Sequence, residues 1–192
     1  MKKTLSLILV MMTIQLNANE VKKPRDFVKM GNIISFNNSK YYLKSSANPS
    51  PNYFKQEYLR AKSSLDNYKE MITVDVLKGK LTLEQALKVK IQELEQLKKN
   101  NPLVNYAVYK KGESYILDFI MTDGADLFEW NLYKYIVKGK GKQQHLVLIS
   151  YTYKRTIKTT EMGKQFFGYI KAQRNKMIQK LNNVNISSIR II

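Results

Sequence analysis

The segment from residue 103 to residue 156 constrains the fold more than any other part of the sequence. It contains successive runs, LVNYAVY, SYILDFIM, FEWNLYKYIV and HLVLISYTYKR, separated by short turns rich in glycine, lysine and aspartate. Runs of this length with alternating apolar residues are typical of β-strands, and short connections join antiparallel neighbours. We therefore expect an antiparallel meander with turns at residues 110–113, at residues 123–124 and at the KGKGK tip of residues 138–142.

The last two of these strands are predicted to be half apolar on both faces. Phe128, Trp130 and Leu132 alternate to one side, and Tyr133 and Tyr135 lie on the other. A sheet that is covered on both faces explains such a pattern without a ligand. We therefore interpret most aromatic residues of this hairpin as packing side chains, so that only its tip stays a binding candidate.

Two amphipathic helices are predicted. The first, residues 82–100, starts with a capping-box pattern formed by Thr82 and Gln85, and its leucines recur at helical spacing. The second, from about residue 160 to 182, carries an apolar stripe that includes Phe166. Its other face is strongly basic, with Lys164, Lys171, Arg174, Lys176 and Lys180.

The N-terminal half predicts further strands. NIISFNNSKYYLK indicates two short strands around a turn at residues 37–38, and the following SSANPSPN is expected to be a loop. Strands are then predicted at residues 57–59 and 71–77, with a turn of helix opened by Ser64 or Asp66 between them. The sequence therefore indicates an α+β fold, an antiparallel β-sheet flanked by a central helix and a long C-terminal helix.

Residues 57–74, EYLRAKSSLDNYKEMITV, resemble a segment that recurs in small exported bacterial proteins of unknown function. The matching positions are Glu57-Tyr58, Asn67-Tyr68 and the Met-Ile-Thr-Val run at residues 71–74. The element order from residue 71 onward is similar to the PsbP-like α/β/α sandwich, and this resemblance implies an accessory or assembly role without catalytic residues. A cystatin-like or nuclear-transport-factor-like sheet wrapped on one long helix is the alternative fold, and the two differ in whether both faces of the meander are covered.

Residues 1–19 predict a secretory signal peptide. Lys2 and Lys3 precede an apolar run, residues 5–14, that is shorter than the roughly 20 residues of a membrane-spanning helix. Cleavage is expected after Ala18, although Leu16 at the minus-three position is larger than usual; a retained N-terminal anchor is the alternative. Residues 20–31 then form a polar lead-in, and residues 32–192 a single domain of an exported protein, periplasmic or secreted.

The chain is strongly basic. Its formal net charge is +18, or +16 once Lys2 and Lys3 are removed, which favours anionic partners such as nucleic acid, acidic polysaccharide or anionic lipid head groups. AT-rich coding would also enrich lysine, so a compositional origin stays open. The candidate polyanion-binding residues are Lys138, Lys140, Lys142, Lys171 and Arg174.

The sequence offers little for catalysis. It has no cysteine and one histidine, His145, whose odd separation from Ser150 on one strand places the two side chains on opposite faces. No cofactor or metal site is expected, since a lone imidazole excludes the common zinc patterns. A hydrolase with paired carboxylates, drawn from Glu57, Asp118 and Glu129, stays as an alternative.

These observations favour an exported non-enzymatic binding or accessory protein, with an unknown protein partner or an anionic polymer or surface as its ligand. The alternatives are a polyanion binder that uses its basic surface, and the carboxylate-based hydrolase. Oligomeric state is left open by the sequence.

Overall fold

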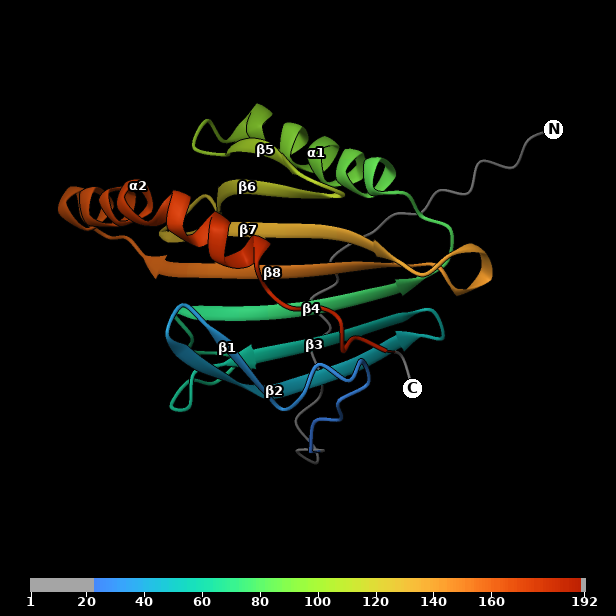
Figure 1. Ribbon diagram of the computed structural model, residues 1–192. Helices are drawn as coiled ribbons and strands as arrows, with labels where there is room; N and C mark the ends of the chain where they lie inside the picture. Colours follow the sequence, from blue (N-terminus) through green and yellow to red (C-terminus); the bar gives the residue numbers. More distant parts are fainter. Residues whose placement is uncertain (1–22, 191–192) are drawn as a thin grey trace.

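The computed structural model describes residues 23–190, and the predicted signal peptide lies outside them. The described residues form an α+β fold with one eight-stranded antiparallel sheet and two long helices, as expected (Figure 1). The strands and helices are β1 (Ile33–Phe36), β2 (Ser39–Ser50), β3 (Tyr53–Leu59), β4 (Glu70–Lys78), α1 (Leu83–Asn100), β5 (Asn105–Lys111), β6 (Ser114–Thr122), β7 (Leu127–Lys138), β8 (His145–Thr156) and α2 (Thr160–Asn182).

The sheet consists of two consecutive meanders. Its strand order is β1-β2-β3-β4-β8-β7-β6-β5, so each half follows the chain and the halves meet where β4 pairs with β8. Val74 lies opposite Ile149 at this junction. Because α1 carries the chain from β4 to the far edge at β5, the returning meander ends beside β4. The meander predicted over residues 103–156 is confirmed.

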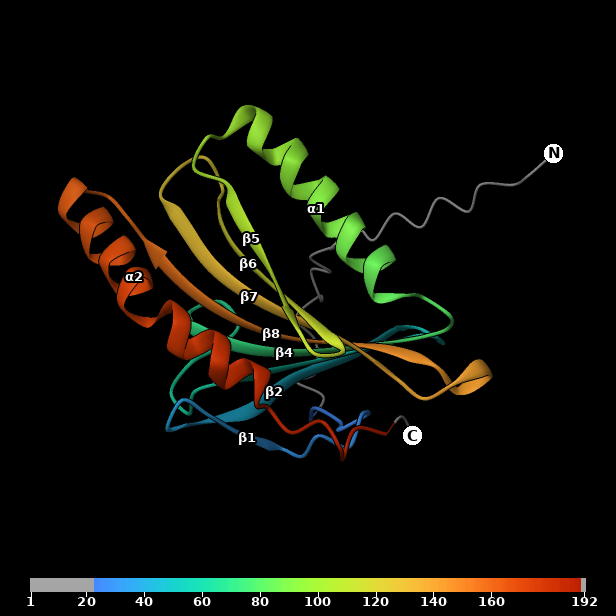
Figure 2. The ribbon, with the colours of Figure 1, turned by 45° about the horizontal axis from the view of Figure 1, so that its top comes forward.

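The two helices lie on opposite faces of strands β5–β8, as Figure 2 shows. On one face α2 buries Phe166 and Ile170 in a large core that includes Trp130 and Tyr151. On the other face α1 packs in a smaller core around Leu94. The predicted apolar character of both faces is confirmed, and this layering differs from a sheet wrapped on a single helix.

Local sequence signals explain where the helices begin. Thr82 and Gln85 form the predicted capping box, in which each side chain accepts a hydrogen bond from the backbone N–H of the other residue. The Thr159 hydroxyl accepts from the Met162 N–H at the start of α2. These caps satisfy backbone donors that have no partner within a helix. The predicted ranges of both helices agree with the structure.

The predicted loop SSANPSPN is wrong, because most of it belongs to β2. This strand extends to Ser50, and its pairing with β3 shifts register between Ala47 and Ser50. β1 is only four residues long, so this end of β2 lies at the edge of the sheet. Pro49, which has no N–H to donate, is tolerated at such an irregular edge.

The helical turn predicted at Ser64 or Asp66 is also wrong. Residues 61–69 form bends and turns, and the Ser64 hydroxyl accepts a hydrogen bond from the Asn67 N–H. Leu59 and Met71 are paired across β3 and β4, so the segment only has to close a hairpin. A single helical turn fixes several dihedral angles and gains only one hydrogen bond. Bends therefore cost less conformational entropy in this connection.

Candidate functional site

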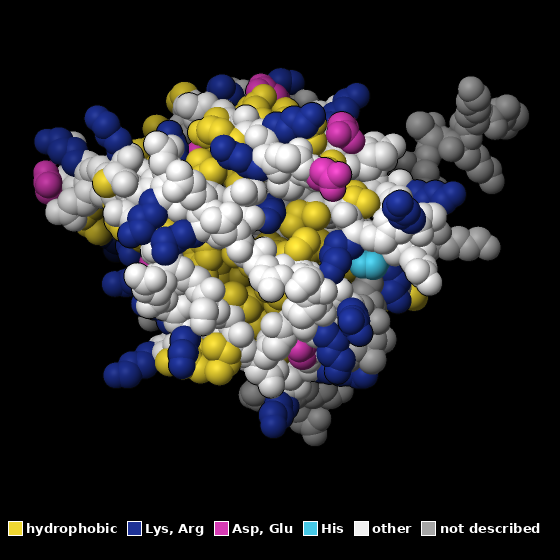
Figure 3. Space-filling view, in the orientation of Figure 1, with side chains coloured by type: hydrophobic (Ala, Val, Ile, Leu, Met, Phe, Trp, Pro, Cys, Tyr) yellow, Lys and Arg dark blue, Asp and Glu magenta, His cyan; other side chains and the backbone are white. Residues whose placement is uncertain are grey.

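A groove lies between β1 and the C-terminal end of α2, and we call it the α2–β1 groove. Its volume is about 550 Å³. Figure 3 shows hydrophobic side chains in the hollow between α2 and the β1–β2 hairpin, with lysines and arginines placed around it. The groove is lined by Met30, residues 33–38, Lys180, Asn183, Val184, Asn185 and Ser188.

The β1–β2 hairpin forms the first wall of the groove. Asn37 and Asn38 have φ values of 47° and 59°, and asparagine tolerates this left-handed conformation in a two-residue hairpin turn. Phe36 is buried, and the centroid of its ring lies 5.4 Å from that of Tyr151 in the central strand β8. The turn and the buried ring therefore fix the hairpin against the sheet.

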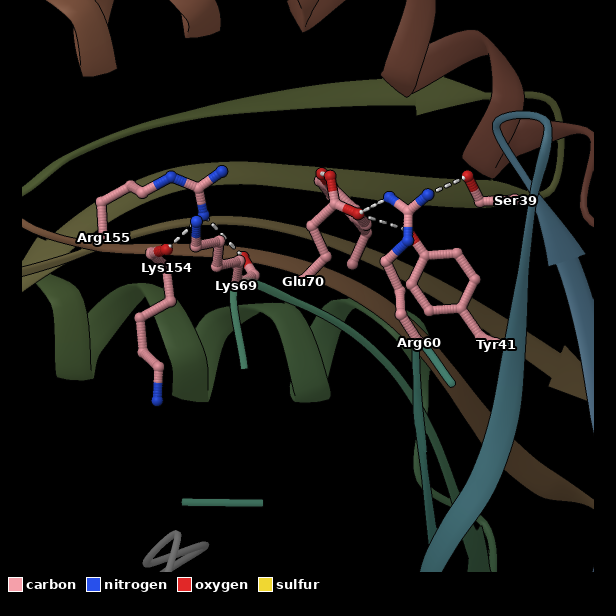
Figure 4. A network of polar contacts seen from close by, with 8 residues as sticks. Ser39, Tyr41, Arg60, Lys69, Glu70, Lys154 and Arg155 are labelled. Atoms are coloured by element: carbon pink, nitrogen blue, oxygen red, sulfur yellow. Dashed lines mark hydrogen bonds and ion pairs between the residues drawn. The ribbon is translucent and has the colours of Figure 1, made fainter. Parts of the chain in front are cut away.

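A polar network centred on Glu70 braces the same hairpin (Figure 4). The Tyr41 hydroxyl donates to the carboxylate at 3.1 Å and the Tyr151 hydroxyl at 3.3 Å. Arg60 donates to Glu70 at 2.6 Å and to the Ser39 hydroxyl at 2.6 Å. Burial and the neighbouring Glu70 raise the pKa of both tyrosines, which keeps their hydroxyls protonated as donors. The network joins β2, β4 and Arg60, the residue after β3, to β8 through one carboxylate.

The second wall contains the C-terminal tail, residues 183–190, which is held by Lys138. The Lys138 ammonium donates to the backbone carbonyls of Ile186, Ser187 and Ile189 at 2.7, 3.3 and 3.2 Å. Burial, followed by the nearby Arg190, lowers the pKa of Lys138. This lysine of the predicted binding tip therefore positions the tail that lines the groove.

The groove is suited to hydrogen bonding. Asn37, Asn38, Asn183 and Asn185 supply side-chain amides, and among the lining residues that the structure describes Lys180 is the one titratable side chain. No carboxylate is among them. The groove can therefore offer a ligand amide and hydroxyl groups, apolar side chains and one positive charge.

Arg174, another predicted polyanion-binding residue, packs against the sheet. Its Nε lies 3.0 Å from Oδ2 of Asp118, whose side chain is 2% exposed, and the Trp130 indole donates to Oδ1 of the same carboxylate at 2.8 Å. Burial raises the pKa of Asp118, while Trp130 and Arg174 oppose that shift. Arg174 thus neutralises a buried acid of the fold.

Of the three remaining candidates, two lie in the tip and the third lies on α2. Lys140 is exposed in the tip, Lys142 lies in the short 3-10 turn Gly141–Gln143, and Lys171 is exposed on α2. Figure 1 shows the tip and the start of α2 at opposite ends of the molecule. Arg174 contacts Asp118, which lies opposite Leu132 in the sheet. Leu132 is six residues before Lys138 on β7. At about 3.3 Å per residue, the tip is therefore about 20 Å from Arg174. The structure does not bring the tip and Lys171 into one patch.

The predicted carboxylates do not form a pair. Asp118 faces the α2 side of the sheet, with Trp130, whereas Glu57 alternates with Gln56 and Tyr58 and so faces the other side. Glu129 shares the face of Glu57, but β4 and β8 lie between their strands. Three strand spacings amount to about 14 Å, beyond the roughly 5–9.5 Å of glycosidase carboxylates.

Sequence reasoning missed a buried acid, Asp75, on the α1 side of β4. It is 7% exposed and accepts a hydrogen bond from the Tyr53 hydroxyl at 2.6 Å. Burial raises its pKa to about 6, although Tyr53 and Lys55 act in the opposite direction. An aspartate within the apolar run ITVDVL was the available signal. Asp75 lies on the face of the sheet opposite to the α2–β1 groove.

Within the described residues, no group of three or more His, Cys, Asp or Glu side chains is placed to hold a metal ion. Neither helix in this part of the chain is long and apolar enough to cross a membrane.

The fold and the groove define a domain with an antiparallel sheet between two helices and a polar groove at one sheet edge. The chain belongs to a protein family of unknown function, whose family model matches residues 28–186. No curated protein and no solved structure matches it. The matched residues include every strand and helix and the residues that line the groove, except Ser188.

Proposed function

We propose that the protein is an exported, non-enzymatic binding or accessory protein that receives a partner in the α2–β1 groove. The observation that carries this proposal is the mixed lining of a 550 Å³ groove, in which apolar side chains lie beside amides and hydroxyls and Lys180 is the one titratable side chain among the described residues. General acid–base catalysis requires a titratable group within reach of the substrate, whereas recognition requires hydrogen-bonding groups in a cavity of this size.

Two further observations support the proposal. The similarity of the element order to the PsbP-like sandwich, in which both faces of the sheet are covered, implies an accessory or assembly role. The signal peptide predicted at residues 1–19 supports export.

The proposal is tested with a photo-crosslinking amino acid introduced at Ser35 or, as a control, at Val108. Ser35 is an exposed residue of the groove, and Val108 is 40% exposed on β5, the opposite edge strand. We expect a discrete adduct at Ser35 in the cells that make the protein, and none of the same mass at Val108. Adducts of equal yield at both positions, or none at Ser35, would contradict a partner in the groove.

A further inference from the structure

The groove contains an unusual wall, the free edge of a β-strand. β1 pairs with β2 on one side, and within the described residues no strand pairs with its other side. A free strand edge presents backbone donors and acceptors that can pair with another extended chain. The register between β1 and β2 shows which backbone N–H and C=O groups of β1 face away from β2.

The outward groups of β1 belong to Ile33 and Ser35. The Leu43 N–H donates to the Asn32 carbonyl at 2.9 Å, so Asn32 and Leu43 form a hydrogen-bonded pair. Hydrogen-bonded and non-hydrogen-bonded pairs alternate along an antiparallel ladder. The pairs of Ile33 with Tyr42 and of Ser35 with Lys40 are therefore non-hydrogen-bonded, and the N–H and C=O groups of Ile33 and Ser35 face away from β2.

The chain's own tail already pairs with the segment before this edge. The Arg190 N–H donates to the Val28 carbonyl at 2.9 Å, and Val184, Asn185 and Ser188 of the tail line the groove. Beyond this contact the tail and β1 are separated by the groove. Four residues of extended chain span about 13 Å, which is the length of β1.

Charge indicates the chemistry of the occupant. The groove contains Lys180 and no carboxylate among its described lining residues, and Lys29 and Lys40 are exposed next to it in sequence. The whole chain carries a formal charge of +18, so a second copy would be repelled. Opposite charge would instead attract an acidic partner and orient it.

We infer that the α2–β1 groove binds an acidic, extended peptide segment of a partner, which adds as a strand to the Ile33 and Ser35 edge of β1. Backbone hydrogen bonds would supply the affinity, and the amides and Lys180 would select the side chains. This inference rests on the proposed function and gives its partner a chemical class.

The experiment uses a fluorescent eight-residue peptide of alternating valine and glutamate, with binding measured by anisotropy. Two control peptides carry lysine for glutamate, or N-methyl groups on alternate backbone amides. We expect that of the three peptides only the unmodified acidic one binds, and that its binding changes the amide NMR signals of Ile33 and Ser35. Binding of the N-methylated peptide with equal affinity would overturn strand addition, and equal binding of the lysine peptide would overturn the acidic specificity.

A pair of variants locates the edge. Ser35→Pro removes one outward N–H and leaves the hydrogen bonds to β2 intact. Val108→Pro does the same on β5. The Lys111–Ser114 pair closes the β5–β6 hairpin, so the alternation makes Val108 and Leu117 a non-hydrogen-bonded pair. Thermal unfolding first establishes that both variants fold. Loss of one hydrogen bond is expected to weaken peptide binding about fivefold in Ser35→Pro and to leave Val108→Pro unchanged. Equal affinity of Ser35→Pro and the unaltered chain would overturn the inference.

Two further outcomes separate this inference from the proposed function. A crosslink from Ser35 to a partner, together with no acidic-peptide binding, would overturn the inference and leave the proposed function standing. Concentration-dependent dimerisation in sedimentation, abolished by Ser35→Pro, would identify a second copy as the occupant and overturn the acidic partner.

Discussion

Asp75 shows how a single residue in this fold can oppose its stability. Its carboxyl is buried on β4 between Lys55 and Leu148 of the neighbouring strands. The pKa of about 6 lies above the ordinary value of 3.8, so the folded state binds more protons than the unfolded state between these pH values. Stability contributed by Asp75 is therefore present at low pH and falls as the pH rises through about 6.

The variant Asp75→Asn should remove this penalty, because asparagine stays neutral and keeps an oxygen that can accept from Tyr53. A shift of this size corresponds to about 2–3 kcal/mol. Urea unfolding measures how much more stable Asp75→Asn is than the unaltered chain. We expect this gain in the free energy of unfolding to be about 2–3 kcal/mol larger at pH 8 than at pH 4. Asp66→Asn, in an exposed loop, is the control. A gain that is the same at both pH values would contradict a titrating Asp75.

At the scale of elements, the strand-rich regions and the helices were predictable because each has a clear periodicity. The helix over residues 82–100 had both a cap and regular leucines, and the meander had turn residues at each reversal. The end of β2 was not predictable, since Pro49 and the serines signal a loop, and only pairing with β3 makes this segment a strand. The groove was equally hidden, because it joins β1 to a tail about 150 residues away.

The tip illustrates the same limit for the candidate site. Lys138, Lys140 and Lys142 are equivalent in sequence, yet the ammonium of Lys138 is held by the C-terminal tail and Lys140 is exposed. Gly139 between them has φ +77°, and a Cβ there would collide with the Gln143 carbonyl. Long-range contacts of this kind leave no local pattern in the sequence.

Lys138→Met is predicted to release the tail. The methionine keeps most of the apolar stem but cannot donate to the carbonyls of Ile186, Ser187 and Ile189. Because the site is partly solvated, we expect a stability loss of about 1 kcal/mol. Hydrogen exchange should quicken at Ile189 and Arg190, whose amides donate to Ile186 and Val28.

The matched control is Lys140→Met, which removes an exposed charge of the same tip. Unchanged exchange at residues 189–190 in Lys138→Met, or equal acceleration in both variants, would show that the ammonium does not hold the tail. The same pair tests the groove indirectly, since release of Val184 and Asn185 would disturb one of its walls.

At the scale of the whole molecule, lysines and arginines occur in both helices and in most of the strands. In the view of Figure 3 lysines and arginines occur over both helices and around the groove. Two of the five predicted polyanion-binding residues, Lys138 and Arg174, are engaged by the tail carbonyls and by Asp118. A polyanion would therefore meet a general positive field, which attracts without selecting a site.

This distribution predicts how DNA binding responds to salt. Binding of a short duplex is measured by anisotropy over a range of salt concentrations for Lys140→Ala/Lys142→Ala and for Lys98→Ala/Lys99→Ala, whose lysines are exposed in the last turn of α1. The affinity for DNA falls with salt, and each lost phosphate contact reduces the magnitude of the slope of log K against log salt by about 0.9. If the whole field binds DNA, the two double variants, which lose equal charge, should lower the slope equally. A slope lowered by about two in the tip variant and unchanged in the α1 variant would instead assign the contacts to the tip.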